Sequence, residues 1–200
     1  MFKEIGAEEL AGNPFAHIGE AYMLVSAGNR KVFNAATVSW GSLGRLWDKP
    51  VATLYLRPQS ETKKIMDKAA RFAVSFFSPE FRDALAAGGG KGPPKQICSP
   101  FGFLLTHILS RFGWKERLKA FHVEDTVSFQ QASLILICKK LYHAPLDKDG
   151  FVGSDLGKEY YSAGDYHTLY MGEILKALIS KENALPGHLA TEPDTGDNRR

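Results

Sequence analysis

The sequence has little cysteine and lacks the segments that direct a chain to or across a membrane. Its 200 residues include two cysteines, Cys98 and Cys138, which form no CxxC pair. The N-terminus, MFKEIGAEEL, lacks the apolar stretch of a signal peptide. The apolar run from Phe101 to Leu109 is too short to cross a bilayer. We therefore expect reduced thiols, a cytoplasmic location and no membrane partner.

Common motifs for nucleotide, metal and nucleophilic sites are missing as well. The segment AAGGGKGPP matches neither GxGxxG nor GxxxxGK[ST]. The six histidines show no HExxH and no zinc spacing, so no metal site is predicted. No GxSxG is present either. The net charge of +3 is scattered without a long Lys/Arg block, which argues against a nucleic-acid partner.

What the sequence does contain is a series of strand-like runs with few helical ones. Apolar runs bounded by turn residues predict strands over 21–28, 32–40, 51–56, 71–77, 132–142 and 167–179. Short helices are expected over 61–70 and after Ser78-Pro79. Because strands and helices do not alternate as βαβ units, we expect a mainly β fold with appended helices, either a barrel or a sandwich. The length suits one domain over 1–182, and the polar composition of 183–200 predicts a frayed tail.

The stretch from Asn34 to Lys63 gathers hydroxyls, amides and cations at the ends of two strand-like runs. The second run is followed directly by Arg57, Gln59, Ser60, Thr62 and Lys63, where a helix is expected to begin. Donors collected at a helix start suit a phosphate group. The alternative is local: Ser60 caps the helix, Thr62 lies in its first turn and Lys63 is solvated. The residues alone leave both interpretations open.

His167 is the one histidine whose position draws attention. It follows Asp165 at the entrance to the last predicted strand. The spacing favours a strand-edge imidazole that is hydrogen-bonded by Asp165.

Four blocks of sequence, in order, resemble one known family. They are NAATVSWGSLG, KPVATLYLRPQSET, RFAVSFFSPEFRDAL and GDYHTLYMGEILKAL. Together they are similar to the flavin reductase-like proteins with an FMN-binding split barrel, over roughly residues 21–179. The resemblance implies a six-stranded antiparallel Greek-key split barrel. It also implies a homodimer that holds FMN, without covalent attachment, at the subunit interface.

The resemblance also assigns roles to individual residues. The first block implies contacts to the isoalloxazine ring and ribityl chain from Thr37, Val38, Ser39 and Trp40, and Asn34 is expected to bind the cofactor as well. The second implies contacts to the ribityl chain and phosphate from Arg57, Gln59, Ser60, Thr62 and Lys63. In relatives that use a nicotinamide, a histidine of the last block lies near that ligand, so His167 is expected to have that role.

One segment departs from the family pattern. Relatives usually carry a GTxSGRD-like loop after the RDAL helix, whereas this chain has a longer and more apolar insertion over 88–122. We expect Phe101, Phe103, Leu104 and Leu105 to form a lid over the site or additional dimer surface, or else the segment to pack as an extra helix.

Two functions agree with these features. The first is an NAD(P)H-dependent flavin reductase, with NAD(P)H as co-substrate and FMN as cofactor. The second is an FMN-binding electron-transfer protein that exchanges electrons with a redox partner protein. The same fold supports both, so the fold does not decide between them.

Overall fold

The computed structural model describes residues 1–10, 12–20, 23–82, 85, 118–152 and 155–182. Most of the predicted insertion (88–117) and the whole predicted tail (183–200) lie outside these residues. The strands are β1 (Phe2–Ile5), β2 (Met23–Gly28), β3 (Phe33–Val38), β4 (Gly41–Leu46), β5 (Lys49–Leu56), β6 (Arg71–Phe76), β7 (Ala120–Val123), β8 (Thr126–Phe129), β9 (Leu134–Pro145) and β10 (Thr168–Ser180). The helices are η1 (Ala7–Glu9), η2 (Ala16–Glu20), α1 (Glu61–Met66), η3 (Pro79–Phe81), η5 (Lys148–Gly150) and α4 (Leu156–Tyr160).

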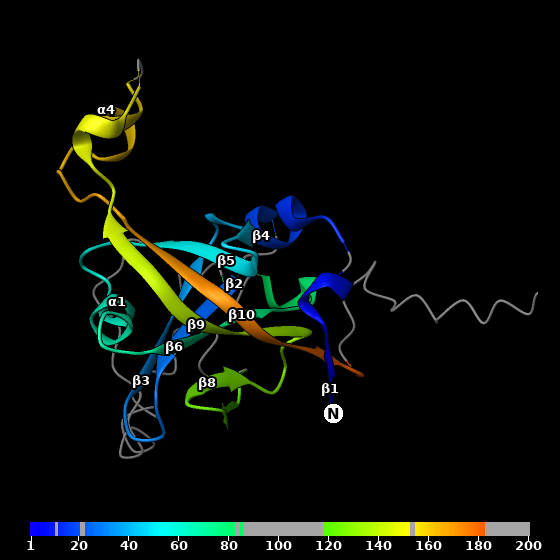
Figure 1. Ribbon diagram of the computed structural model, residues 1–200. Helices are drawn as coiled ribbons and strands as arrows, with labels where there is room; N and C mark the ends of the chain where they lie inside the picture. Colours follow the sequence, from blue (N-terminus) through cyan, green and yellow to red (C-terminus); the bar gives the residue numbers. More distant parts are fainter. Residues whose placement is uncertain (11, 21–22, 83–84, 86–117, 153–154, 183–200) are drawn as a thin grey trace, which may run out of the picture.

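One antiparallel sheet forms the body of the molecule (Figure 1). Its strand order is β3-β2-β6-β9-β10-β5-β4, and β1 pairs with β10 off this path. Strands β7 and β8 form a separate hairpin. The mainly β prediction is confirmed, but the main sheet of the described residues has eight strands rather than six. In this part of the chain, no helix has the length and apolar character needed to span a bilayer.

The residues between the predicted strands 32–40 and 51–56 contain a further strand, β4. β4 pairs with β5 from Gly41↔Leu54 to Leu46↔Lys49. Trp47 and Asp48 join the two strands with φ of 52° and 58°, the left-handed conformation that tight hairpins use. Two glycines give the sequence GSLGRL little intrinsic strand preference. Pairing with the buried strand β5 overrides that preference.

The sheet curves around one apolar core and carries a second on its other face. Alternate residues divide between the two: Val25 and Leu136 belong to the first core, whereas Leu24 and Ile135 belong to the second. This division follows from the two-residue period of a strand. Val38 and Leu43, on the two edge strands β3 and β4, both pack against the first core. The two edges of the sheet therefore approach one another.

The segment that connects β9 to β10 leaves the sheet. Residues 146–167, here called the excursion, contain η5 and α4 and stand apart from the body in Figure 1. The excursion returns to β10 beside β5, because Thr168 pairs with Leu56. This register places residues 165–167 next to the residues that follow β5.

Candidate functional site

Helix α1 begins where the sequence predicts it. Ser60 is the N-cap, and its Oγ accepts a hydrogen bond from the Lys63 amide at 3.4 Å. Thr62 is only 1% exposed in the first turn. The local role expected for Ser60 is confirmed, and the backbone turns sharply here to place Arg57 and Gln59 just ahead of the helix.

Arg57 and Gln59 converge on one carboxylate oxygen. Arg57 Nη1 lies 2.5 Å from Asp165 Oδ2, and Gln59 Nε2 lies 3.3 Å from the same atom. Hydrogen bonds from Gln59 and Arg57 lower the pKa of Asp165. We call these three residues the loop cluster, because each lies outside a regular helix or strand. The cluster joins the end of β5 to the end of the excursion.

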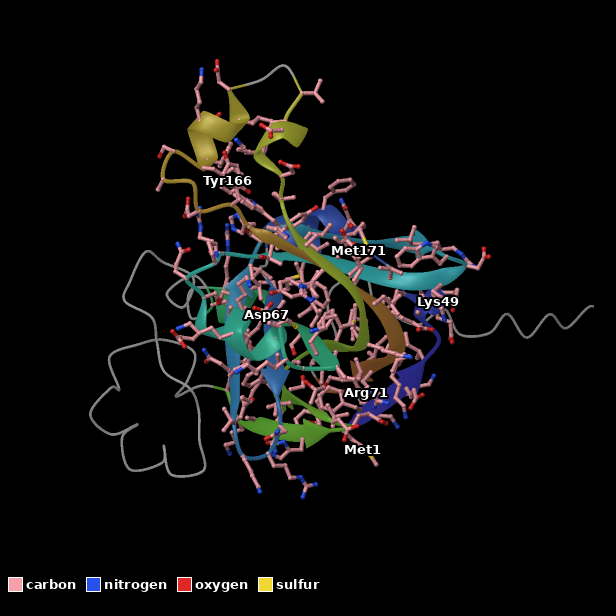
Figure 2. All side chains as sticks on the ribbon, turned by 60° about the vertical axis from the view of Figure 1, so that its left-hand side comes forward. Met1, Lys49, Asp67, Arg71, Tyr166 and Met171 are labelled. Carbon is pink, nitrogen blue, oxygen red and sulfur yellow. The ribbon has the colours of Figure 1, made fainter. Side chains whose placement is uncertain are left out.

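The other cation of the predicted phosphate set, Lys63, belongs to a different group. Its Nζ lies 2.7 Å from Asp67 Oδ2, while Tyr170 donates a hydrogen bond to Asp67 Oδ1. Lys140 Nζ donates to the Met66 and Asp67 carbonyls at 2.7 and 2.8 Å. We call Lys63, Asp67, Lys140 and Tyr170 the helix-end cluster, which anchors α1 to β9 and β10. Figure 2 shows Asp67 against the body of the molecule, whereas Tyr166 lies out on the excursion.

The electrostatics of the helix-end cluster fix its charges. Burial raises the pKa of Tyr170, and the neighbouring Asp67 carboxylate raises it further. Burial acts to raise the pKa of Asp67, but hydrogen bonds from Lys63 and Tyr170 lower it overall. Asp67 is therefore an anion held by a cation and a neutral phenol. Such a group stabilises the fold and leaves the Lys63 ammonium engaged within the protein.

The residues predicted to contact the flavin ring lie along β3 and just after its end. Asn34 is buried, and its Oδ1 has no hydrogen-bond partner among the described residues. Thr37 Oγ1 donates to the Leu85 carbonyl at 2.9 Å. Val38 and Ser39 are half-buried, whereas Trp40 is 41% exposed. The strand thus passes from the core to an exposed indole at the point where β3 ends.

Trp40 meets the excursion through an aromatic group. Its ring centroid lies 4.9 Å from that of His167 and 5.7 Å from that of Tyr160. Tyr161 packs edge-on to His167, and its hydroxyl lies 2.9 Å from His167 Nδ1. We call Trp40, Tyr160, Tyr161 and His167 the aromatic group. The expected hydrogen bond from Asp165 to His167 is wrong: Tyr161 is the partner, because Asp165 is engaged by Arg57 and Gln59.

His167 is neutral at physiological pH. Its residue is 6% exposed, and burial lowers its pKa to about 4, with a further contribution from the Arg57 charge. A phenol is a better donor than acceptor, so we expect the Tyr161 hydroxyl to donate to Nδ1 and the proton of His167 to reside on Nε2. The imidazole can offer an N–H to a ligand but is a poor proton donor in acid–base chemistry.

The structure therefore brings together two parts of the predicted site through the excursion. Arg57 and Gln59 contact Asp165, and two residues later His167 contacts Trp40. The sequence reasoning overlooked Asp165 as a partner of Arg57, and it overlooked Tyr161 altogether. The antiparallel register of β5 and β10 would have indicated the first, since it places 165–167 opposite 57–59.

The side chains of this region offer the chemistry needed to bind an anionic group and a flat ring. A guanidinium and an amide point at one oxygen position, which suits an anionic group. An exposed indole beside a neutral imidazole suits a flat, weakly polar ring. The two features lie at neighbouring positions along the end of the excursion.

Comparison with solved structures identifies the fold. The chain is similar to an FMN-binding domain of a flavin reductases-like enzyme from Shewanella baltica, with a TM-score of 0.56, 13% identity, and 90% of this chain and 77% of that chain covered. It is similar to an NADH:FAD oxidoreductase from Streptomyces globisporus, with a TM-score of 0.54, 13% identity, and 82% and 77% covered. It is also similar to flavoredoxin from Methanosarcina acetivorans, with a TM-score of 0.55, 13% identity, and 80% and 69% covered.

Sequence comparison adds nothing to this picture. No protein-family model matches the chain, and no curated protein matches it either. The structural similarity establishes the fold, whereas identities of 13% leave the activity open. The chain has the fold of the flavin reductase-like, FMN-binding proteins, as the four sequence blocks predict.

Proposed function

We propose that this chain binds FMN without covalent attachment and acts as an NAD(P)H-dependent flavin reductase. The observation that carries the proposal is the convergence of Arg57 and Gln59 on one anionic oxygen, beside the start of α1. A phosphate oxygen at that position would receive a charge-assisted hydrogen bond. The names of the structural neighbours, which include an FMN-binding domain and an NADH:FAD oxidoreductase, support the same reading.

The described residues fit FMN in two places. Arg57, Gln59 and the capping Ser60 would hold the phosphate and the end of the ribityl chain. Thr37 to Trp40 would line the ring and the sugar alcohol. Asn34, earlier on the same strand, has a buried Oδ1 without a hydrogen-bond partner among the described residues and could accept a hydrogen bond from the cofactor. Thr62 is buried and Lys63 is ion-paired, so any contribution they make would be to the shape and charge of the surroundings.

In this proposal the cofactor and the protein supply different parts of the chemistry. When bound, FMN supplies the capacity to accept a hydride from a nicotinamide. The chain would bind the phosphate, orient the ring against Trp40 and keep a neutral N–H of His167 near the nicotinamide. The proposal includes a cytoplasmic homodimer with the flavin at the subunit interface. Trp40 and Tyr160, at 41% and 45% exposed, leave an aromatic surface open to a second copy.

The test is a spectrum followed by an assay. We expect the purified protein, after incubation with FMN and gel filtration, to show visible flavin absorption, and we expect NADH or NADPH to be oxidised faster with protein and FMN than with FMN alone. Absence of flavin binding would reject the whole proposal.

A second function follows from another structural neighbour. Flavoredoxin is one of the structural neighbours, and its name suggests the alternative of an FMN-binding electron carrier that exchanges electrons with a redox partner protein, a function that the same fold can support. Flavin that stays bound through gel filtration, without oxidation of NADH or NADPH, would support the carrier over the reductase.

A further inference from the structure

Asp165 occupies the position where the proposed phosphate donors meet. Its Oδ2 accepts from both Arg57 Nη1 and Gln59 Nε2. Among the described residues, no other acceptor is hydrogen-bonded to either of these side chains. An anionic oxygen of the protein therefore stands where an anionic oxygen of the ligand would be expected.

The excursion presents Asp165 at this position. Gly164 has a φ of +71°, and its amide donates to the Tyr161 carbonyl at 2.9 Å, which closes a turn just before Asp165. Tyr161 and Tyr166 stack on either side of that turn with ring centroids 4.8 Å apart. The backbone of Asp165 is thus positioned by a turn and an aromatic contact, and its carboxylate is held by Arg57 and Gln59.

The interaction is also one that a ligand can displace. The side chains of Arg57 and Asp165 are 41% and 24% exposed. Partly exposed ion pairs of this kind contribute little net free energy, because water competes for both partners. A phosphate dianion carries more charge than a carboxylate and forms charge-assisted hydrogen bonds with the same donors.

We propose that Asp165 is a specificity-determining residue that competes with the flavin phosphate for Arg57 and Gln59. This inference rests on the proposed FMN function. Asp165 opposes any phosphate brought to the loop cluster, both by occupying the donors and by like-charge repulsion. Riboflavin, which has no phosphate, leaves the Arg57–Asp165 pair intact. Asp165 therefore narrows the affinity difference between FMN and riboflavin and favours a flavin that exchanges with solution.

The opposite role has a distinct consequence. If Asp165 instead orients Arg57 toward the phosphate, its removal must weaken FMN. The two roles predict changes of opposite sign, so a single binding measurement separates them.

The experiment compares FMN and riboflavin binding by flavin fluorescence in the wild type and in Asp165→Asn. We expect FMN to bind Asp165→Asn on the order of tenfold more tightly, since one adjacent negative charge is removed. Riboflavin should change by less than about twofold, since no phosphate meets the site. Asp149→Asn is the matched control: it removes a carboxylate from the same excursion, and this side chain is 79% exposed and does not contact Arg57.

Each outcome has a defined meaning. Unchanged or weaker FMN binding in Asp165→Asn, with FMN bound by the wild type, overturns the inference and leaves the proposed function in place. An equal gain for FMN and riboflavin also overturns it, because the effect would not involve the phosphate. If neither protein binds FMN, the proposed function fails and the inference fails with it.

Discussion

The loop cluster and the helix-end cluster use the same chemistry in two different settings. In each, one aspartate accepts hydrogen bonds from a cationic side chain and a neutral donor: Arg57 and Gln59 for Asp165, Lys63 and Tyr170 for Asp67. Tyr170 is fully buried and Lys63 is 19% exposed, whereas Arg57 is 41% exposed. The donors of the helix-end cluster are therefore more buried than Arg57, although the Asp67 side chain, at 35% exposed, is more open than that of Asp165 at 24%.

The difference follows from where the groups are attached. Lys63 and Tyr170 lie within α1 and β10, and Asp67 caps the end of α1, so packing fixes their separation. Arg57 and Gln59 follow β5, and Asp165 lies in the excursion. A buried group that loses its hydrogen-bond partner cannot form a replacement hydrogen bond with water, whereas a half-exposed group can. The helix-end cluster is suited to stability, and the loop cluster is suited to exchange with a ligand.

The largest expected effect concerns His167, which lies beside the loop cluster. Its pKa is about 4 in the folded protein, against 6.5 ordinarily. The unfolded chain binds the proton first as pH falls, so this residue's contribution to the free energy of unfolding is complete above pH 6.5 and is lost between pH 6.5 and 4. The loss is roughly 3 kcal/mol.

Denaturant unfolding at several pH values would measure this effect. His167→Gln, which does not titrate, should show a smaller loss of stability over the same range. Parallel pH profiles for the wild type and the variant would show that His167 is not the group responsible.

The next effect tests the helix-end cluster directly. Asp67→Ala should lower the free energy of unfolding by about 2 kcal/mol, because the buried Tyr170 hydroxyl loses its acceptor. Urea denaturation measures the change. Asp155→Ala is the control, since it removes a carboxylate that is 86% exposed and paired only with Lys158 among the described side chains. An equal, small effect in both variants would remove the distinction between the two clusters.

An effect of similar size is expected for ligand binding at the loop cluster. Arg57→Ala should weaken FMN roughly ten- to a hundredfold, the value of one or two charge-assisted hydrogen bonds, and should leave riboflavin nearly unchanged. Fluorescence titration measures both. Arg45→Ala, which removes an exposed arginine from the β4–β5 hairpin, serves as the control. FMN titrations that coincide for Arg57→Ala and the wild type would reject the phosphate assignment.

The smallest effect is the one that Asp165 has on stability. Asp165→Ala should leave the urea midpoint almost unchanged, because its ion pair is partly exposed and water replaces the lost partner. The same replacement at Asp67 should be clearly destabilising. A large loss of stability in Asp165→Ala would show that the excursion depends on this pair and is not free to release it.

Several elements were predictable because they depend on neighbours in the chain. The apolar runs of β2 and β6 and the Ser60 cap of α1 are local patterns, and the structure has them. β4 was missed because its two glycines have weak strand preference, and only pairing with β5 orders it. β7 and β8 were missed as well, and they form a short separate hairpin.

In the candidate site too, some features depend on neighbours in the chain and others depend on distant strands. Local sequence indicated that Arg57, Gln59 and Ser60 gather donors ahead of a helix, and the four blocks pointed to the flavin reductase-like fold, which the structural comparison supports. Which carboxylate those donors meet could not be read from spacing, since Asp165 is more than a hundred residues away. The antiparallel register of β5 and β10 brings Asp165 beside Arg57 and Gln59. The same register places His167 where it contacts Tyr161 and Trp40 instead of Asp165. The sequence by itself determined six of the eight strands of the main sheet, the cap of α1 and the donors. Only the tertiary structure decided their partners, because pairing between distant strands depends on the whole sheet closing around its core.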